Sequence, residues 1–512
     1  MQCIVFTDSN RLAAKYRTSR QDVCKLLHRN LDNHPSVEFL ILDAVDYQDE
    51  LGSQPTWKEY REVVVDFMAG MGLTPSMKLS LFIVGGDDVI PMPRVVNPIN
   101  ESEMLHVDML YCFKDDEIET LDMRKAMCNV GRLPLESGSL SSKLSDDLQS
   151  YFNLSNMMLA SGIEVNKVVM TTAESWLPAS HDMVRGLPVQ ELTKISGATN
   201  GNLYVSPRLS VDDSYVVRQY RSDIAQADLL MFNLHGSDTP RNSSFYGEGL
   251  NGHNTPEAFR CDMLKHSGAR ILNTVACFGG RYIGYNRKDS MLMSALYGGG
   301  VLLYAGSCTS ALGRTGRMHH VAQDALIPSG YSESFMKLYT LYLFKGVTAG
   351  EAFLAAKCDY YNFCHTLDGD EQALATVYMF NLYGMPVLSV NKDKDIVQGA
   401  RGFQEVKPVN ITKKYSYRPV SADNKLSSGD ILEQVRSAVD RNLRLIRNMV
   451  ESKLYSYWGL NPCDLTRIDE VLNNSAHDGY RFEYFTQGDM VGKRTWAYID
   501  KSGNVKDVVH FK

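Results

Sequence analysis

The chain lacks long apolar runs. No segment approaches the roughly 18 consecutive apolar residues of a membrane-spanning helix. The N-terminus has only the short apolar stretch from Cys3 to Phe6, whereas a secretory signal needs about 7–15 apolar residues after a basic start. We therefore expect a cytoplasmic protein that makes no membrane contact.

Paired cysteines are lacking too. The 10 cysteines are scattered, and no two of them form a CxxC pair. In a chain of this size without an export signal, such cysteines are typical of reduced thiols, and a structural zinc site is not expected. The GxGxxG fingerprint of dinucleotide binding follows none of the predicted strands. We expect neither a metal nor a cofactor.

An excess of basic charge is also missing. The chain carries 53 Lys and Arg against 60 Asp and Glu, a net charge of −7. This balance argues against a broad surface for nucleic acid or anionic lipid, so neither is expected as a partner. What the chain has is ordinary globular composition, 44% hydrophobic and 22% charged, and 512 residues, enough for about three domains.

Apolar runs of strand length alternate with helical patterns over most of the chain. Continuous apolar runs, rather than strict alternation, are typical of strands covered on both faces, as in parallel sheets. Segments such as Ser141 to Met158 and Glu333 to Lys345 predict helices between them. The fold class is therefore α/β, with parallel sheets flanked by helices. The predicted strands are 3–6, 38–44, 79–86, 167–174, 227–236, 270–280, 300–307 and 386–390.

Three parts are predicted along the chain. A polar stretch and a turn at Gly162 suggest two α/β subdomains, 1–160 and 161–400, each with its own sheet. After Val390 the sequence becomes polar and irregular, and 401–512 is predicted to be a small α+β domain. Its predicted elements are an amphipathic helix over 431–450, a shorter helix over 464–472, and strands over 480–485, 494–500 and 505–511.

Two predicted strands end in reactive side chains close to glycines. LLMFNLHG (229–236) ends with His235 and Gly236, and ILNTVACFGG (271–280) contains Cys277. The separation of His235 and Cys277 suits a strand, a crossover and the next parallel strand. Both side chains are then expected at the carboxyl edge of one sheet, where open α/β folds build their sites.

These residue types match the needs of thiol chemistry. A nucleophilic thiolate requires a base or a cation beside it, and an imidazole fills that role while also protonating a leaving amine. Backbone N–H groups of Gly236 and Cys277 could form an oxyanion hole, because small residues let the backbone approach a substrate carbonyl. On the residues alone, the alternative of a structural histidine and a buried structural cysteine stays open.

The sequence around this pair resembles the caspase-like (clan CD) cysteine peptidases, in particular their gingipain-type branch, close to the CHAT-type domains. His235-Gly236 on one strand and the Cys277 motif on the next are similar to the dyad motifs of that family. Met385 departs from the family, which usually has Asp there, and the segment between the dyad residues looks longer and more polar than expected. Five further motifs follow the family order: LSLFIVGGDDVIPMP (79–93), HVDMLYCF (106–113), NVGRLPLES (129–137), YAGSCTSA (304–311) and FNLYGMPVLSV (380–390).

The resemblance implies roles for particular residues. Cys277 would be the nucleophile and His235 its base. Glu174 is the candidate to orient His235, since the family sometimes places an acidic residue after that strand; a solvated loop carboxylate is the alternative. Gingipain relatives cleave after basic residues and true caspases after Asp, and we predict a basic P1 residue. The predicted specificity pocket contains Asp182, Ser307, Cys308 and Thr309.

The prediction is thus a cytoplasmic cysteine endopeptidase that cleaves protein or peptide substrates with a Cys–His dyad. An activator or regulatory protein partner is expected, because an intracellular peptidase must be held inactive until it is needed. The polar loop over 237–268 and the tail domain are the predicted places of control. Two alternatives stay open: a catalytically silent scaffold or sensor module with the same fold, and a transpeptidase or amidase that uses the same dyad.

Overall fold

The computed structural model allows most of the chain to be described. The described residues are 1–512 except 33, 48–50, 53, 115–122, 136–142, 190, 193–198, 201–202, 239–241, 251–253, 314–330, 366–369, 392–414, 420–463, 474–475, 488–491, 501–504 and 512.

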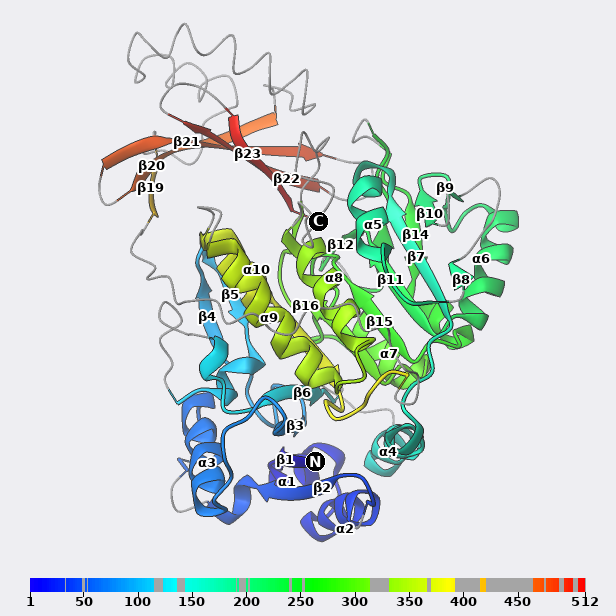
Figure 1. Ribbon diagram of the computed structural model, residues 1–512, viewed down its shortest axis with the longest axis vertical. Helices are drawn as coiled ribbons and strands as arrows, with labels where there is room; N and C mark the ends of the chain where they lie inside the picture. The colour runs from blue at the N-terminus through cyan, green and yellow to red at the C-terminus, as the bar shows by residue number, and fades with distance from the viewer. Residues whose placement is uncertain are drawn as a thin grey trace, which may run out of the picture.

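A single twelve-stranded sheet forms the centre of the molecule (Figure 1). Neighbouring strands are parallel except for two antiparallel pairs, β16 with β18 and β9 with β10. Helices flank this sheet, so the predicted α/β class is confirmed. In spatial order the strands are β2 (Glu38–Asp43), β1 (Gln2–Thr7), β3 (Ser80–Val84), β6 (Asn129–Leu133), β18 (Phe380–Gly384), β16 (Leu303–Ser307), β15 (Ile271–Thr274), β11 (Leu229–Asn233), β7 (Lys167–Ala173), β10 (Leu203–Ser206) and β9 (Thr199–Asn200), and β8 (Glu191–Leu192) pairs with β7.

The helices follow from ordinary local signals. For example, α3 (Trp57–Gly70) begins with a capping box, in which Thr56 and Glu59 each accept from the other's backbone N–H. The other α-helices are α1 (Ser9–Tyr16), α2 (Arg20–Leu31), α4 (Leu144–Ser161), α5 (Leu177–Val184), α6 (Ser214–Gln226), α7 (Met291–Gly298), α8 (Tyr331–Leu343), α9 (Ala349–His365) and α10 (Asp370–Met379). Short 3₁₀ helices are η1 (Ala44–Tyr47), η2 (Asp108–Cys112), η4 (Met123–Lys125), η5 (Glu174–Trp176), η6 (Cys261–His266) and η7 (Arg287–Asp289).

The expectation of two separate sheets is wrong. The strand β18, which comes late in the chain, pairs with β6 through Tyr383 and Arg132 and joins the two halves into one sheet. The predicted strand over 386–390 is also displaced, because the strand is 380–384. Residues 389 and 390 make only isolated bridges, to Thr348 and Ile163. The subdomain boundaries near 160 and 400 stay predictions.

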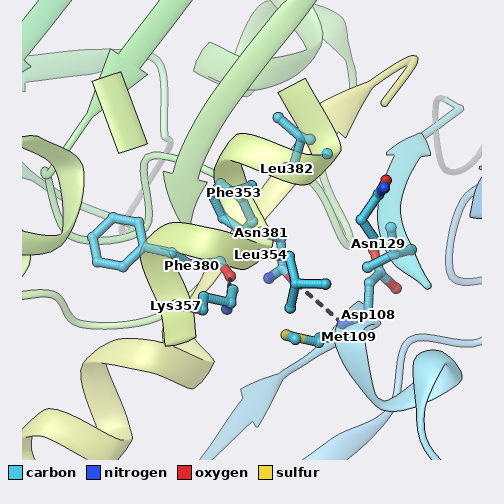
Figure 2. A pocket seen from close by; sticks show the side chains of 11 residues that line it. Asp108, Met109, Asn129, Phe353, Leu354, Lys357, Phe380, Asn381 and Leu382 are labelled. Carbon is cyan, nitrogen blue, oxygen red and sulfur yellow. Dashed lines mark hydrogen bonds between the residues drawn. The ribbon is translucent and has the colours of Figure 1, made fainter. Parts of the chain in front are cut away.

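Motifs that are far apart in the sequence meet at the junction of the two halves. Arg132 on β6 is fully buried and binds Asp108 through two hydrogen bonds, of 2.6 and 2.7 Å, and it also donates to the carbonyls of Gly85 and Ile90. The side chain of Asn381 on β18 accepts from the Asp108 N–H at 3.0 Å, drawn as a dashed line in Figure 2. Breaking such a buried ion pair by removing one partner costs about 3–5 kcal/mol.

A buried lysine lies in the same region. Lys357 on α9 donates to the Phe380 carbonyl at 2.9 Å, and its ammonium lies 5.1 Å from the ring centroid of Phe353. Figure 2 shows these side chains around a small cavity that Asp108 and Asn381 also line. Burial lowers the pKa of Lys357 to about 7, because the charged ammonium is poorly solvated there.

The segment after His235 is folded, and the expectation of a loop over 237–268 is therefore only partly met. It forms a three-stranded antiparallel sheet of β12 (His235–Gly236), β13 (Ser244–Tyr246) and β14 (Glu257–Arg260). A separate hairpin consists of β4 (Arg94–Asn97) and β5 (Asn100–His106).

The tail contributes five strands of a six-stranded sheet, of which β20 to β23 are orange to red in Figure 1. Its order is β17 (Leu312–Gly313), β23 (Val505–Phe511), β22 (Gly492–Asp500), β21 (Ala476–Gln487), β20 (Leu465–Asn473) and β19 (Tyr415–Pro419). The three predicted strands are confirmed, and the amphipathic helix predicted over 431–450 lies outside the described residues.

The helix predicted over 464–472 is wrong, because this segment is the strand β20. Its buried apolar residues Leu465, Ile468 and Val471 are three apart, which mimics a helical face. The pairing of β20 with β21 has register shifts near both ends of this segment, between residues 465 and 467 and between 471 and 472. The bulge between 465 and 467 places Leu465 and Ile468 on the same face, where both belong to one apolar cluster. The pairing is regular from Ile468 to Val471, so Val471 faces the other side, and the spacing of three only imitates a helix.

Candidate functional site

Two neighbouring parallel strands bring the predicted dyad to one edge of the main sheet. β11 pairs with β15, from Leu229 with Ile271 to Phe232 with Thr274, so His235 and Cys277 both follow the carboxyl ends of adjacent strands. The two chain segments touch: a Cβ added to Gly236 would lie 1.8 Å from the Cys277 carbonyl oxygen. Only glycine fits at position 236, which explains why this residue follows the histidine.

The thiol of Cys277 is enclosed. The side chain is buried, with the residue 4% exposed, and its Sγ accepts a hydrogen bond of 3.1 Å from the Ala311 N–H. The thiol also donates to the Ala311 carbonyl at 3.7 Å, so one residue contacts the sulfur through both of its backbone polar groups. The next residue, Phe278, has φ = 56°, an uncommon value for a residue with a side chain, and it marks a sharp turn after the cysteine.

The turn after Cys277 is held against the segment after β16. The Phe278 N–H donates to Thr309 O at 2.8 Å, and the Gly280 N–H donates to Ser307 O at 2.7 Å. Two of the backbone amides near the thiol are therefore already engaged. The predicted oxyanion hole, formed by the amides of Gly236 and Cys277, stays a prediction.

A carboxylate that the sequence reasoning missed lies at His235. The Glu248 Oε2 is 3.4 Å from the His235 Nε2, and the two residues are 1% and 2% exposed. The indole of Trp176 packs on the imidazole, with ring centroids 4.5 Å apart. The one local signal for Glu248 is its place between two glycines, Gly247 and Gly249, which by itself predicts only a turn.

Glu174, the predicted orienter, follows β7 as expected and therefore lies at the same sheet edge. Its carboxylate pairs with Arg208, with Oε1 3.6 Å from the guanidinium nitrogen. Its backbone N–H donates to the Glu248 carbonyl at 2.9 Å. The role of Glu174 stays a prediction, whereas the carboxylate that the structure places against His235 is that of Glu248.

The predicted pocket residues fall into two groups. Ser307, Cys308 and Thr309 are buried beside the Cys277 turn, as described above. Cys308 lies 2.6 Å from the Tyr383 hydroxyl, and burial raises its pKa to about 12, which makes this thiol inert. Asp182 lies on α5 and pairs with Arg185 at 3.0 Å. Its pocket role stays a prediction.

A glutamate that was not among the predicted site residues lies next to the segment that covers the Cys277 thiol. Glu103 on β5 accepts from the Ser310 N–H at 3.2 Å, and Ser310 precedes Ala311, whose amide binds the Cys277 sulfur. Glu103 is only partly buried. The Glu103 carboxylate therefore binds the residue that directly precedes Ala311, which covers the Cys277 thiol.

Within the described ranges, no three His, Cys, Asp or Glu side chains gather as a metal site would require. Among the described helices, none has both the length and the apolar character that a membrane crossing needs.

Comparisons with known proteins give backbone similarity only. No protein-family model and no curated protein matches the chain. Its structure is similar to the complex of the pro- and mature domains of Porphyromonas gingivalis RgpB, at 11% identity, covering 99% of each chain with a TM-score of 0.48. It is also similar to the Arg-specific cysteine proteinase gingipain R (RGPB), at 11% identity, covering 100% of this chain and 96% of that one with a TM-score of 0.47. A structure described as a protease, also at 11% identity, covers 99% and 96% with a TM-score of 0.48. No residue role is transferred from these likenesses.

Proposed function

We propose that this chain is an intracellular cysteine endopeptidase in which Cys277 and His235 act as a dyad. The observation that supports this proposal is the close approach of Gly236 to the Cys277 carbonyl, just after the ends of the paired strands β11 and β15. A histidine and a cysteine at adjacent strand ends can exchange a proton, which is the step that activates a thiol nucleophile.

The proposed reaction has two steps. His235 takes the thiol proton, the Cys277 sulfur bonds to the substrate carbonyl carbon, and the C–N bond breaks as His235 returns the proton to the leaving amine. Water then attacks the thioester with His235 as base, and the acid product and the thiol are regenerated. The amides of Gly236 and Cys277 would stabilise the oxyanion.

We propose a basic P1 residue and an intracellular location. The carboxylate of Glu103, next to the segment that covers Cys277, supports the first, because a carboxylate near the site attracts Lys or Arg. The eight cysteines whose side chains are described support the second, since each of them is a free thiol. Cys112 and Cys128 are not linked, although their sulfur atoms are 3.4 Å apart.

We also propose that the C-terminal sheet holds the site closed. Ala311, which donates to the Cys277 sulfur, is followed by Leu312 and Gly313, and these two residues form β17 and pair with β23. Displacing β23 would release the segment that covers the nucleophile. A regulatory protein partner that binds this strand edge in place of β17 would therefore activate the enzyme.

One observation favours the alternative of a silent scaffold: both dyad residues are buried. The test is incubation of wild type and an opened variant, Phe511→Ala, with peptidyl chloromethyl ketones that carry Lys, Arg or Asp at P1, followed by mass mapping. We expect a covalent adduct at Cys277 with the basic reagents, and none on Cys277→Ala. No adduct at Cys277 in either protein would establish the scaffold, and preference for the Asp reagent would refute the basic P1.

Product analysis tests the endopeptidase proposal against the transpeptidase and amidase alternatives. Proteome peptides are incubated with the opened variant and with its Cys277→Ala counterpart, in the presence of an added amine nucleophile. New carboxyl termini that depend on Cys277 are expected for hydrolysis of peptide bonds. Products that carry the added amine would show a transpeptidase, release of ammonia without chain cleavage would show an amidase, and identical cleavage by both proteins would refute the dyad.

A further inference from the structure

The strongest unassigned feature of the site is a buried carboxylate. Glu248 is 1% exposed, and its Oε2 accepts from the Ser175 hydroxyl at 2.6 Å and lies 3.4 Å from the His235 Nε2. A buried carboxylate is costly unless it is paired, and a well-packed apolar residue of similar volume is often equally stable or more so. The presence of a carboxylate here therefore suggests a role in the chemistry of His235.

The main chain fixes Glu248 in place from two sides. Its carbonyl accepts from the N–H groups of Glu174 at 2.9 Å and Ser175 at 3.4 Å, directly after β7. The flanking glycines bind the strand that returns beside it: Gly247 N–H donates to Pro256 O at 2.9 Å, and Gly249 N–H donates to Asn254 O at 3.0 Å. A group that orients a reacting side chain must itself be rigid, and Glu248 meets this requirement.

The neighbours of the imidazole also restrict how it can turn. The ring of Trp176 lies on it at 4.5 Å between centroids, and on its own strand His235 pairs with Tyr246 of β13. Among the described residues, the charged or titratable groups on the elements next to His235 are Glu248, the Glu174–Arg208 pair, Tyr246 and Glu257 on β13 and β14, Cys277, and the Arg281–Asp238 pair on the two loops that follow the dyad residues. The pKa of Tyr246 is raised, mainly by burial, so it stays neutral at the pH of the experiments below.

We propose that Glu248 is the positioning residue of His235. It holds the imidazole with its proton on Nε2, so that Nδ1 is the nitrogen that takes the proton of Cys277, and its charge balances the imidazolium that forms. At 3.4 Å the Glu248 Oε2 and the His235 Nε2 are within ion-pair distance but do not meet hydrogen-bond geometry. In enzymes without substrate such contacts are commonly long and tighten in the complex.

This proposal rests on the proposed dyad, and it assigns to Glu248 the role that sequence resemblance assigns to Glu174. The two glutamates therefore form a matched pair of variants. The two residues are neighbours, since the Glu174 N–H donates to the Glu248 carbonyl, but the Glu174 carboxylate pairs with Arg208 and the Glu248 carboxylate faces His235. Replacing either by glutamine keeps the size and removes the charge.

The experiment measures the rate at which iodoacetamide modifies Cys277 between pH 5 and 9, by mass spectrometry of the full chain digested after the reaction. Only the thiolate reacts, so the rate at low pH reports the imidazolium–thiolate pair. We expect Glu248→Gln to lower the rate at pH 6 by at least about tenfold and to move the profile to higher pH, because each pKa unit is a factor of ten. Glu174→Gln should stay within about twofold of wild type across the range.

Further variants separate a positioning role from a structural one. Glu248→Asp should restore part of the rate at pH 6, and Ser175→Ala, which removes the hydrogen bond to Oε2, should shift the profile in the same direction by less. A purely structural role would lower the unfolding midpoint without moving the profile. If Glu248→Gln does not fold, Ser175→Ala carries the test.

The outcomes distinguish two failures. An unchanged profile in Glu248→Gln and Ser175→Ala, or a shift in Glu174→Gln alone, would overturn the assignment of Glu248 but leave the dyad. A His235→Ala variant with the wild-type profile would instead refute the dyad, because no imidazole would then act on the thiol.

Discussion

The proposed closure of the site by the C-terminal sheet leads to a quantitative prediction for Phe511→Ala. Phe511 is 6% exposed, packs edge-on against Trp496 with ring centroids 4.6 Å apart, and belongs with Trp496 to the core of the main domain. It pairs with Leu312 of β17. The side chain therefore belongs to the contact that docks the tail sheet, whereas the interior of that sheet has a separate apolar cluster.

The magnitude follows from the loss of a buried aromatic ring. Truncating a buried Phe to Ala costs about 3–5 kcal/mol. If the loss falls on the docking contact, the undocked population rises by a factor of about 10² to about 4 × 10³, since about 1.4 kcal/mol corresponds to a factor of ten. We expect the rate of Cys277 modification by iodoacetamide at neutral pH to rise by a similar factor, until the open form predominates.

Val508→Ala is the matched control on the same strand. Val508 is fully buried in the separate cluster of the tail sheet, with Ile468, Tyr484, Ala497 and Ile499. It should lower the thermal unfolding midpoint of the tail but raise the Cys277 rate by less than about tenfold, because the deleted group is small and away from the docking contact. An unchanged rate in Phe511→Ala, or equal rates in both variants, would refute closure by the docked strand.

Two further predictions concern the site and the buried lysine. Gly236→Ala should lower the Cys277 modification rate at pH 6 at least about tenfold, because its Cβ would lie 1.8 Å from the Cys277 carbonyl oxygen. Gly298→Ala is the control and should leave the rate unchanged, because its Cβ meets nothing within 4 Å. Equal rates in the two variants would count against the strand-end contact. Lys357 has a pKa of about 7 in the folded chain and about 10.4 when unfolded, so between these values the unfolded state binds more protons and stability rises with pH. From pH 7 to 9.5 the free energy of unfolding of the wild type should therefore rise by up to about 3 kcal/mol relative to that of Lys357→Met. Urea titrations of both proteins at the two pH values measure this difference. The same change in unfolding free energy with pH in both proteins would contradict a neutral buried lysine.

Much of the fold could be predicted from the sequence because its signals are local. Buried parallel strands read as continuous apolar runs, and seven of the eight predicted strands coincide with strands of the main sheet. The same local logic failed for β20, where a bulge and residues buried on both faces give a spacing of three, and it could not show that β18 closes two expected sheets into one. Strand pairing depends on residues hundreds of positions apart, which no local pattern records.

The sequence by itself determined where a reactive histidine and cysteine stand, because each follows a strand and is accompanied by glycine, and parallel strands end at a common edge. Only the tertiary structure decided what surrounds them. Glu248 rather than the predicted Glu174 faces His235, and Ala311, carried by a segment paired with the last strand of the chain, covers Cys277. A carboxylate in a polar segment reads as solvated until folding buries it, since burial and charge pairing are properties of the packed chain and not of the local sequence.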